Sequence, residues 1–213
     1  ALGPDGKILY TASAKQIRAY DLATGKHEVI DIGAGANDIV VSHAGHLYFT
    51  DPKEGKVWHI DLKTKKRKMA ASVNGLNGIG MSADQTQLFV CEFAGPYVHS
   101  FSIEEDGSLK NRQAYFYAQQ STQNSTVGLD GQCAVASGHL LVGTFAGLQI
   151  FDQPGRVQLV LPRPAYEDGR VNYCAVHGDM LYIATRHRIY KRKVKLQEAP
   201  AWKSPVKPPK PRL

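Results

Sequence analysis

The 213-residue sequence lacks long apolar runs, extended segments with amphipathic-helix spacing, and more than three cysteines. A membrane-spanning helix needs about 20 apolar residues in succession, so none is expected. The missing helical periodicity favours a fold made of strands. The odd cysteine count and the absence of C-x-x-C spacing argue against a disulfide framework or a zinc site. We expect Cys91, Cys133 and Cys174 to be small, buried, apolar residues.

Several common functional motifs are missing as well. The sequence has no G-x-S-x-G, no phosphate-binding loop and no H-E-x-x-H. Its net charge of +7 comes mainly from one turn at residues 63–68 and from the C-terminal region. These basic residues are not interleaved with stacking aromatic residues, as a nucleic-acid-binding face would require. We therefore expect no nucleic-acid partner.

The main feature of the sequence is a repeat. Short apolar strands recur around five anchor residues, at Tyr10, Tyr48, Phe89, Leu141 and Tyr182. Their spacings of 38, 41, 52 and 41 lie near the ~40–45 residues of a propeller blade. The longest interval contains a polar loop at residues 119–126. The repeat predicts an all-β propeller with about five blades visible, and a β-meander or solenoid is the alternative.

Two units follow from this repeat. We expect the propeller to occupy residues 1–195 and a Pro- and Lys-rich tail, extended and weakly ordered, to occupy residues 196–213. Ala1 aligns with the interior of an innermost strand, so we expect the chain to be the C-terminal portion of a longer protein. No signal peptide is recognisable at the start, and a periplasmic or secreted location is slightly favoured over a cytoplasmic one.

One polar residue precedes the first strand in each of four repeats, 10 to 12 positions before the anchor. These residues are Asn37, Asn77, Asp130 and Asn172. A propeller arranges equivalent positions in a ring around its axis, and a ring of amide and carboxylate oxygens suits a hard metal ion. The alternative is backbone capping, which Asn and Asp often provide.

The residues that follow each second strand return to the same face. They are Asp51, Glu92, Phe145 and Arg186. Together they could bind a polar, anionic or polyhydroxylated ligand. The alternative is ordinary turn chemistry, which is favoured for Asp51 because a proline follows it. Histidines near the turns between first and second strands should lie at the opposite end: His43, His46, His139 and His177.

The expected chemistry centres on Asp130, the only carboxylate of the proposed ring. Asn37, Asn77 and Asp130 would bind a divalent cation, which can polarise a carbonyl oxygen. Asp130 would then act as a base toward water or as the nucleophile itself.

Three segments resemble the gluconolactonase and senescence-marker-protein family, which includes regucalcin-like members. They begin at Asn37-Asp38-Ile39, Asn77-Gly78-Ile79 and Leu129-Asp130-Gly131. The resemblance extends to about Val194. It implies a six-bladed propeller whose first blade lies outside this chain, a divalent metal on the axis, and hydrolysis of sugar lactones.

The resemblance also implies which residues act. Asn37, Asn77 and Asp130 match the metal ligands, and the ion is expected to be calcium, with zinc or magnesium as the other candidates. Asn172 and the four rim residues would form a second shell or contact the substrate. Two differences stand out. The family's first ligand, a glutamate in an opening blade, has no counterpart here, which bears on catalysis by this chain. Gly35 replaces an arginine that often precedes the ligand asparagine by two positions, which bears on the substrate.

Two other functions fit the same pattern. One is a non-catalytic propeller that binds a ligand or another protein through this face. The other is a calcium-dependent hydrolase of phosphotriesters or aryl esters. A metal titration separates the first from a lactonase, and a panel of lactones and phosphotriesters separates the second.

Overall fold

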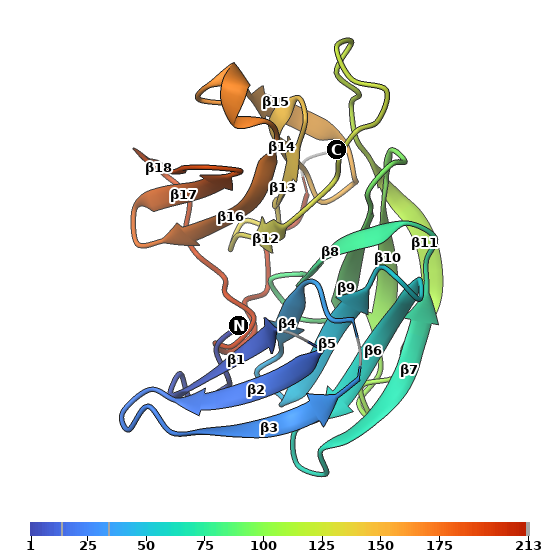
Figure 1. The fold of residues 1–213 in the computed structure, drawn as a ribbon. Helices are drawn as coiled ribbons and strands as arrows, with labels where there is room; N and C mark the ends of the chain where they lie inside the picture. The colour runs from blue at the N-terminus through green and yellow to red at the C-terminus, as the bar shows by residue number, and fades with distance from the viewer. Residues whose placement is uncertain (14, 34, 212–213) are drawn as a thin grey trace.

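The protein is a β-propeller of five antiparallel sheets arranged around one axis (Figure 1). The computed structural model describes residues 1–13, 15–33 and 35–211. Blades 1 and 2 consist of β1 (Ile8–Ser13), β2 (Gln16–Asp21) and β3 (His27–Ile32), then β4 (Ile39–Val41), β5 (His46–Asp51), β6 (Lys56–Asp61) and β7 (Lys66–Ser72). Blade 3 consists of β8 (Leu76–Met81), β9 (Gln87–Glu92), β10 (Tyr97–Ile103) and β11 (Leu109–Tyr117).

Blades 4 and 5 follow blade 3 around the axis. They consist of β12 (Gln132–Ala134), β13 (Leu140–Thr144), β14 (Gly147–Phe151) and β15 (Val157–Leu161), then β16 (Val171–His177), β17 (Met180–Thr185) and β18 (Ile189–Lys193). A single 3-10 turn, η1 (Tyr166–Asp168), is the only helical element of the described chain. No helix in the described ranges is long and apolar enough to cross a membrane. The predicted propeller and its repeat are confirmed.

The start of the chain pairs with β1 as the repeat predicts. Leu2 forms a bridge with Leu9, and the amide of Tyr10 donates to the carbonyl of Ala1 at 2.8 Å. The amide of Gly3 donates to Ile8 at the same distance. Residues 1–3 therefore take the place of an innermost strand in blade 1.

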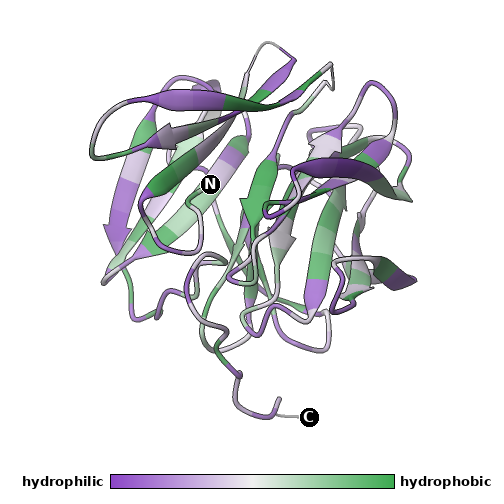
Figure 2. Ribbon diagram, turned by 90° about the horizontal axis from the view of Figure 1, so that it is seen from below, coloured by the Kyte–Doolittle hydropathy of each residue, from purple (hydrophilic) through white to green (hydrophobic). Residues whose placement is uncertain are grey.

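Four apolar clusters hold the blades together, because side chains of a strand alternate between its two faces. In β5, Leu47 and Phe49 pack toward blade 1 with Ile17, whereas Tyr48 packs toward blade 3 with Val90. Similar clusters join blades 3 and 4 and blades 4 and 5. No such cluster among the described residues joins blade 5 to blade 1, so the ring is open there. Hydrophobic residues concentrate on the strands in the middle of the molecule (Figure 2).

The C-terminal tail is extended, as its composition predicts, and it has partners in three blades. Val206 donates to the carbonyl of Ala83 at 2.8 Å, and Glu198 forms a bridge with Val135. The Trp202 ring lies against Gly6. Residues 199–202 also line an axial cavity of about 240 Å³ between the innermost strands. The tail therefore covers one end of the axis, and in Figure 2 the C-terminus lies beyond the sheets at that end.

The first prediction concerns the contact between blades 4 and 5. Leu141 is fully buried in that cluster, whereas Leu159 on β15 is 50% exposed. Truncating Leu141 leaves a cavity that the neighbouring blades cannot fill. We expect Leu141→Ala to lower the free energy of unfolding by about 2–5 kcal/mol. The matched Leu159→Ala should change it by less than about 0.5 kcal/mol. Urea unfolding measures both, and equal effects would contradict the packing described.

The second prediction concerns pH. His59 is 1% exposed, its Nε2 lies 3.0 Å from Nδ1 of His46, and its ring packs on Tyr48. Burial, followed by the His46 charge, lowers the pKa of His59 to about 4. The folded state therefore binds the proton more weakly than the unfolded state, so stability is lost as pH falls from 6.5 toward 4. We expect a loss on the order of 2 kcal/mol across that window in urea unfolding.

Replacement of His59 tests this assignment. His59→Gln should remove most of the pH dependence, whereas the exposed His187→Gln should leave it in place. If both variants kept the dependence of the parent protein, the His59 explanation would be wrong.

Candidate functional site

The predicted residues Asn77, Asp130 and Asn172 lie with Asp38 at the end of the axis opposite the tail. Each lies where an innermost strand begins and where the second strand of the same blade ends. The amide of Asn37 donates to the Thr50 carbonyl at 2.8 Å, and that of Asp130 donates to Gly143 at 3.0 Å. In blade 5, Val171 pairs with Thr185. The first strands thus start at the face to which the second strands return, as predicted.

Glycines bring the innermost strands of neighbouring blades into backbone contact. A Cβ atom on Gly78 would lie 2.1 Å from the carbonyl oxygen of Asp130, and one on Gly131 would lie 2.7 Å from that of Asn172. The amide of Gly131 instead donates to the Asn172 carbonyl at 2.8 Å. Only glycine permits this approach, and each glycine is adjacent in sequence to a polar residue. Asn77, Asp130 and Asn172 are thereby carried together.

Asp130 is held from one side. Its Oδ2 accepts hydrogen bonds from Nε of Arg170 at 2.8 Å and from Nδ2 of Asn172 at 3.0 Å. Its Oδ1 accepts none from the described residues. Oδ1 of Asn172 is buried and has no hydrogen-bond partner among the described residues. Asn77 uses Nδ2 to donate to Leu129 at 3.4 Å, which leaves its Oδ1 open. Oδ1 of Asp130 and Oδ1 of Asn77 are therefore free of hydrogen bonds from the described residues, whereas Oδ1 of Asn172 is unpaired but buried.

Asp38 is a second carboxylate at this end of the axis, although it is not one of the four predicted ring positions. Its oxygens accept the amides of Ile39 at 2.9 Å and Ile79 at 3.1 Å, which ties blade 2 to blade 3. Burial, with a smaller contribution from the charge of Asp130, raises the pKa of Asp38 to about 6. Asn37 beside it is exposed. In the sequence, the only indication of a role for Asp38 is its position directly after Asn37, a predicted ligand.

An arginine and two aromatic rings form a wall beside Asp130. The guanidinium carbon of Arg170 lies 4.8 Å from the ring centre of Phe93 and 5.8 Å from that of Phe145. The two rings meet edge to face at 6.4 Å. Phe145 is a predicted rim residue, whereas sequence reasoning missed Arg170 and Phe93.

A spacing in the sequence could have found Arg170. It precedes Asn172 by two positions, which is the interval at which the family places an arginine before its ligand asparagine. In blade 2 that position is Gly35, and a Cβ atom there would lie 2.9 Å from Oδ1 of Asp51. A larger side chain would displace Asp51, so blade 2 cannot carry the arginine without rearrangement.

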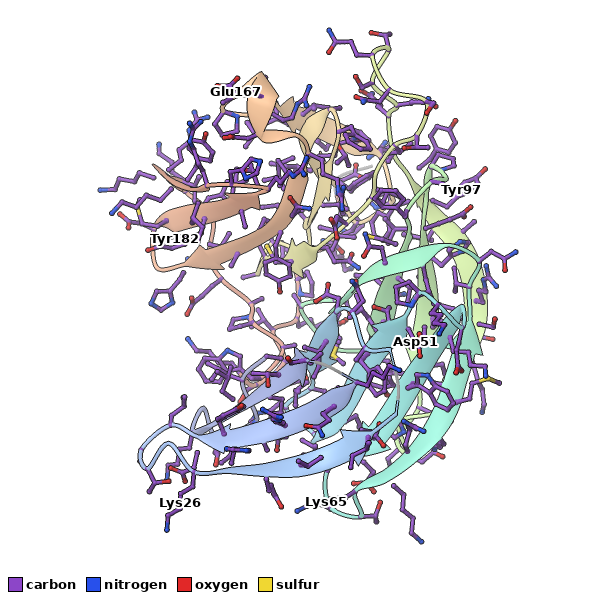
Figure 3. The ribbon with its side chains drawn as sticks, in the orientation of Figure 1. Lys26, Asp51, Lys65, Tyr97, Glu167 and Tyr182 are labelled. Carbon is purple, nitrogen blue, oxygen red and sulfur yellow. The ribbon has the colours of Figure 1, made fainter. Side chains whose placement is uncertain are left out.

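Three predicted rim residues have other partners. Asp51 is 1% exposed and accepts the amides of Gly35 at 2.9 Å and Glu54 at 3.3 Å, so it holds a turn. Figure 3 shows it inside the fold, whereas Lys26 and Lys65 lie at outer turns. Glu92 contacts Nε2 of His99 at 3.2 Å within blade 3. Arg186 donates its amide to the Asp168 carbonyl at 3.3 Å. Among the described residues, no hydrogen bond or ion pair joins these three side chains to Asp130.

The donor set fits a hard cation. The open atoms are a carboxylate oxygen of Asp130 and the amide oxygens of Asn77 and of the exposed Asn37, which are the ligand types of calcium and magnesium. The described ranges contain no group of three or more His, Cys, Asp or Glu residues arranged to hold a metal. This chemistry favours calcium or magnesium over zinc, whose sites are rich in nitrogen and sulfur.

Known proteins resemble this chain in sequence and in architecture. The profile of the SMP-30/gluconolactonase/LRE-like region matches residues 1–187. A gluconolactonase of Zymomonas mobilis is 25% identical over 222 aligned positions, covering 91% of this chain and 62% of its own length. This chain thus spans less than two-thirds of that relative.

Solved structures share the fold. A gluconolactonase from Xanthomonas campestris superimposes with a TM-score of 0.71 at 20% identity, covering 90% of this chain and 69% of its own. A calcium-binding regucalcin from Agrobacterium tumefaciens gives a TM-score of 0.74 at 15% identity, covering 92% and 76%. The family match spans most of the sequence, and the chain therefore belongs to the SMP-30/gluconolactonase/LRE-like family.

Proposed function

We propose that the protein is a metal-dependent hydrolase of sugar lactones. One observation carries the proposal: the Asp130 carboxylate at the end of the axis is held through Oδ2 only, with Oδ1 directed to no described donor. A carboxylate with one oxygen anchored and the other open can bind a cation, or accept a proton from water, without losing its orientation. A purely structural aspartate would use both oxygens in hydrogen bonds, as Asp38 does.

Family membership supports the reaction class. The Zymomonas relative is named a gluconolactonase, and one neighbour of the same fold is named a calcium-binding regucalcin. A lactone is a cyclic ester, so its hydrolysis adds water across the C–O bond and yields a hydroxy acid.

The proposed ligands are Asn37, Asn77 and Asp130, with Asn172 behind Asp130. A hard cation bound to them would polarise the lactone carbonyl and offset the charge that develops on its oxygen. Asp130 would act as general base toward the attacking water or as the nucleophile. Asn172 and Arg170 would keep its carboxylate in place, and the Phe93 and Phe145 rings would form the apolar wall of the site. Calcium is the proposed ion, and the proposed partner is the small-molecule lactone.

The third prediction tests Asp130. Asp130→Asn keeps the size of the side chain and one oxygen, but it removes the charge and the basicity. In the full-length protein we expect weaker calcium binding in calorimetry and a loss of lactone turnover of about 10²-fold or more.

Asp179 provides a matched control, because it lies in the turn before β17 and pairs with Lys193 on the outer strand. Asp179→Asn should leave calcium affinity and turnover unchanged. If Asp130→Asn hydrolysed lactone at the parental rate with calcium saturating, the catalytic assignment would fall and a binding propeller would become the better account.

A further inference from the structure

Arg170 is held rigidly at the edge of the site. Its Nε donates to Oδ2 of Asp130 at 2.8 Å, and its guanidinium lies over the Phe93 and Phe145 rings. These contacts come from blades 3 and 4, whereas Arg170 itself lies just before β16 in blade 5. Three blades therefore fix one side chain, which is still 28% exposed.

Most of its donors remain open. A guanidinium has five N–H groups in a rigid fork, and among the described residues only the one on Nε has a hydrogen-bond acceptor. Both terminal nitrogens are without a partner there. Unlike Arg170, the nearby Arg188 reaches the buried carboxylate of Asp168 at 3.3 Å.

Two other acidic side chains, those of Asp168 and Glu92, have partners of their own. Asp168 accepts hydrogen bonds from Arg188 and from the hydroxyl of Tyr190. Glu92 is directed to His99 within its own blade. Asp130 pairs with the guanidinium through Nε, and the two terminal nitrogens of Arg170 have no acceptor among the described residues. A planar fork of this kind binds carboxylate or phosphate oxygens in pairs.

We propose that Arg170 determines specificity by binding an anionic group of the substrate, so that the protein prefers sugar lactones that carry an exocyclic negative charge over neutral ones. The inference rests on the proposed lactonase function and narrows it to a substrate class. The Nε bond to Asp130 sets the distance between this anion and the reacting carbonyl. Phe93 and Phe145 keep the guanidinium from swinging into solvent. Carboxylate and phosphate share the required chemistry, and the choice between them is left to the substrate panel.

The fourth prediction compares lactones of different charge on the full-length, calcium-loaded protein. The substrates are neutral gluconolactone, glucarolactone with its free carboxylate, and phosphogluconolactone. We expect the parent protein to have a higher kcat/KM for at least one of the anionic lactones than for gluconolactone. Arg170→Gln should raise KM for the preferred anionic lactone by about tenfold or more, because a charge-assisted pair is lost. For gluconolactone, kcat/KM should fall by a smaller factor, through the lost Nε bond to Asp130 alone.

Two further variants separate recognition from simple positioning or net charge. Arg170→Lys keeps the charge without the fork and should recover only part of the preference. Arg192→Gln removes an exposed arginine from β18, near the opposite end of blade 5, and should leave all three substrates unaffected. An equal fall in kcat/KM on every lactone in Arg170→Gln would overturn the proposal, because Arg170 would then act only by positioning Asp130.

Direct binding keeps this inference distinct from the lactonase proposal. Calorimetry with glucarate and with phosphogluconate, the hydrolysis products, needs no turnover. We expect the Arg170→Gln variant to bind the preferred anion about tenfold more weakly than the parent protein does. If no lactone were hydrolysed but this difference persisted, the lactonase assignment would fail and anion recognition by Arg170 would stand. If Arg170→Gln bound both acids as tightly as the parent protein, the proposal would be wrong.

Discussion

The backbone contact between the innermost strands of neighbouring blades is the constraint on which the site depends. At Gly78 and Gly131 the strands approach so closely that a Cβ atom would collide with the backbone of the next blade. The polar residue next to each glycine is thereby brought to the axis, whatever its own hydrogen bonds. A side chain at either glycine would push two blades apart and separate Asn77, Asp130 and Asn172, so packing and chemistry share one cause.

The polar residues at this end of the axis differ in their hydrogen bonds and therefore in their roles. Asp38 uses both oxygens to tie blade 2 to blade 3 and is largely structural. Asp130 is anchored by one oxygen only, and the cationic, aromatic wall of Arg170, Phe93 and Phe145 stands beside it. The same end of the axis thus combines open oxygen ligands with an open anion receptor. A lactone that is a cyclic ester at one end and an anion at the other matches both.

Much of the fold could be predicted from the sequence, because blade period and strand alternation are local patterns. The anchors from Tyr10 to Tyr182 mark the strands, and Asn77, Asp130 and Asn172 mark the site end. Arg170 and Phe93 escaped prediction because their contacts cross blades. Asp51 lies on the rim, and its burial and two backbone partners agree with the turn chemistry that its following proline favoured. The partners of the tail likewise depend on distant residues such as Ala83.

The central claim is that oxygens from successive blades bind one hard cation at the end of the axis. The most direct measurement is a crystal structure of the full-length protein grown with calcium, checked by anomalous scattering after exchange for a lanthanide. Our fifth prediction is a single ion there, coordinated by Oδ1 of Asp130 and the amide oxygens of Asn37 and Asn77 at about 2.3–2.6 Å for calcium. No ion at this position under saturating calcium, or an ion bound elsewhere with Asp130 unliganded, would contradict the account.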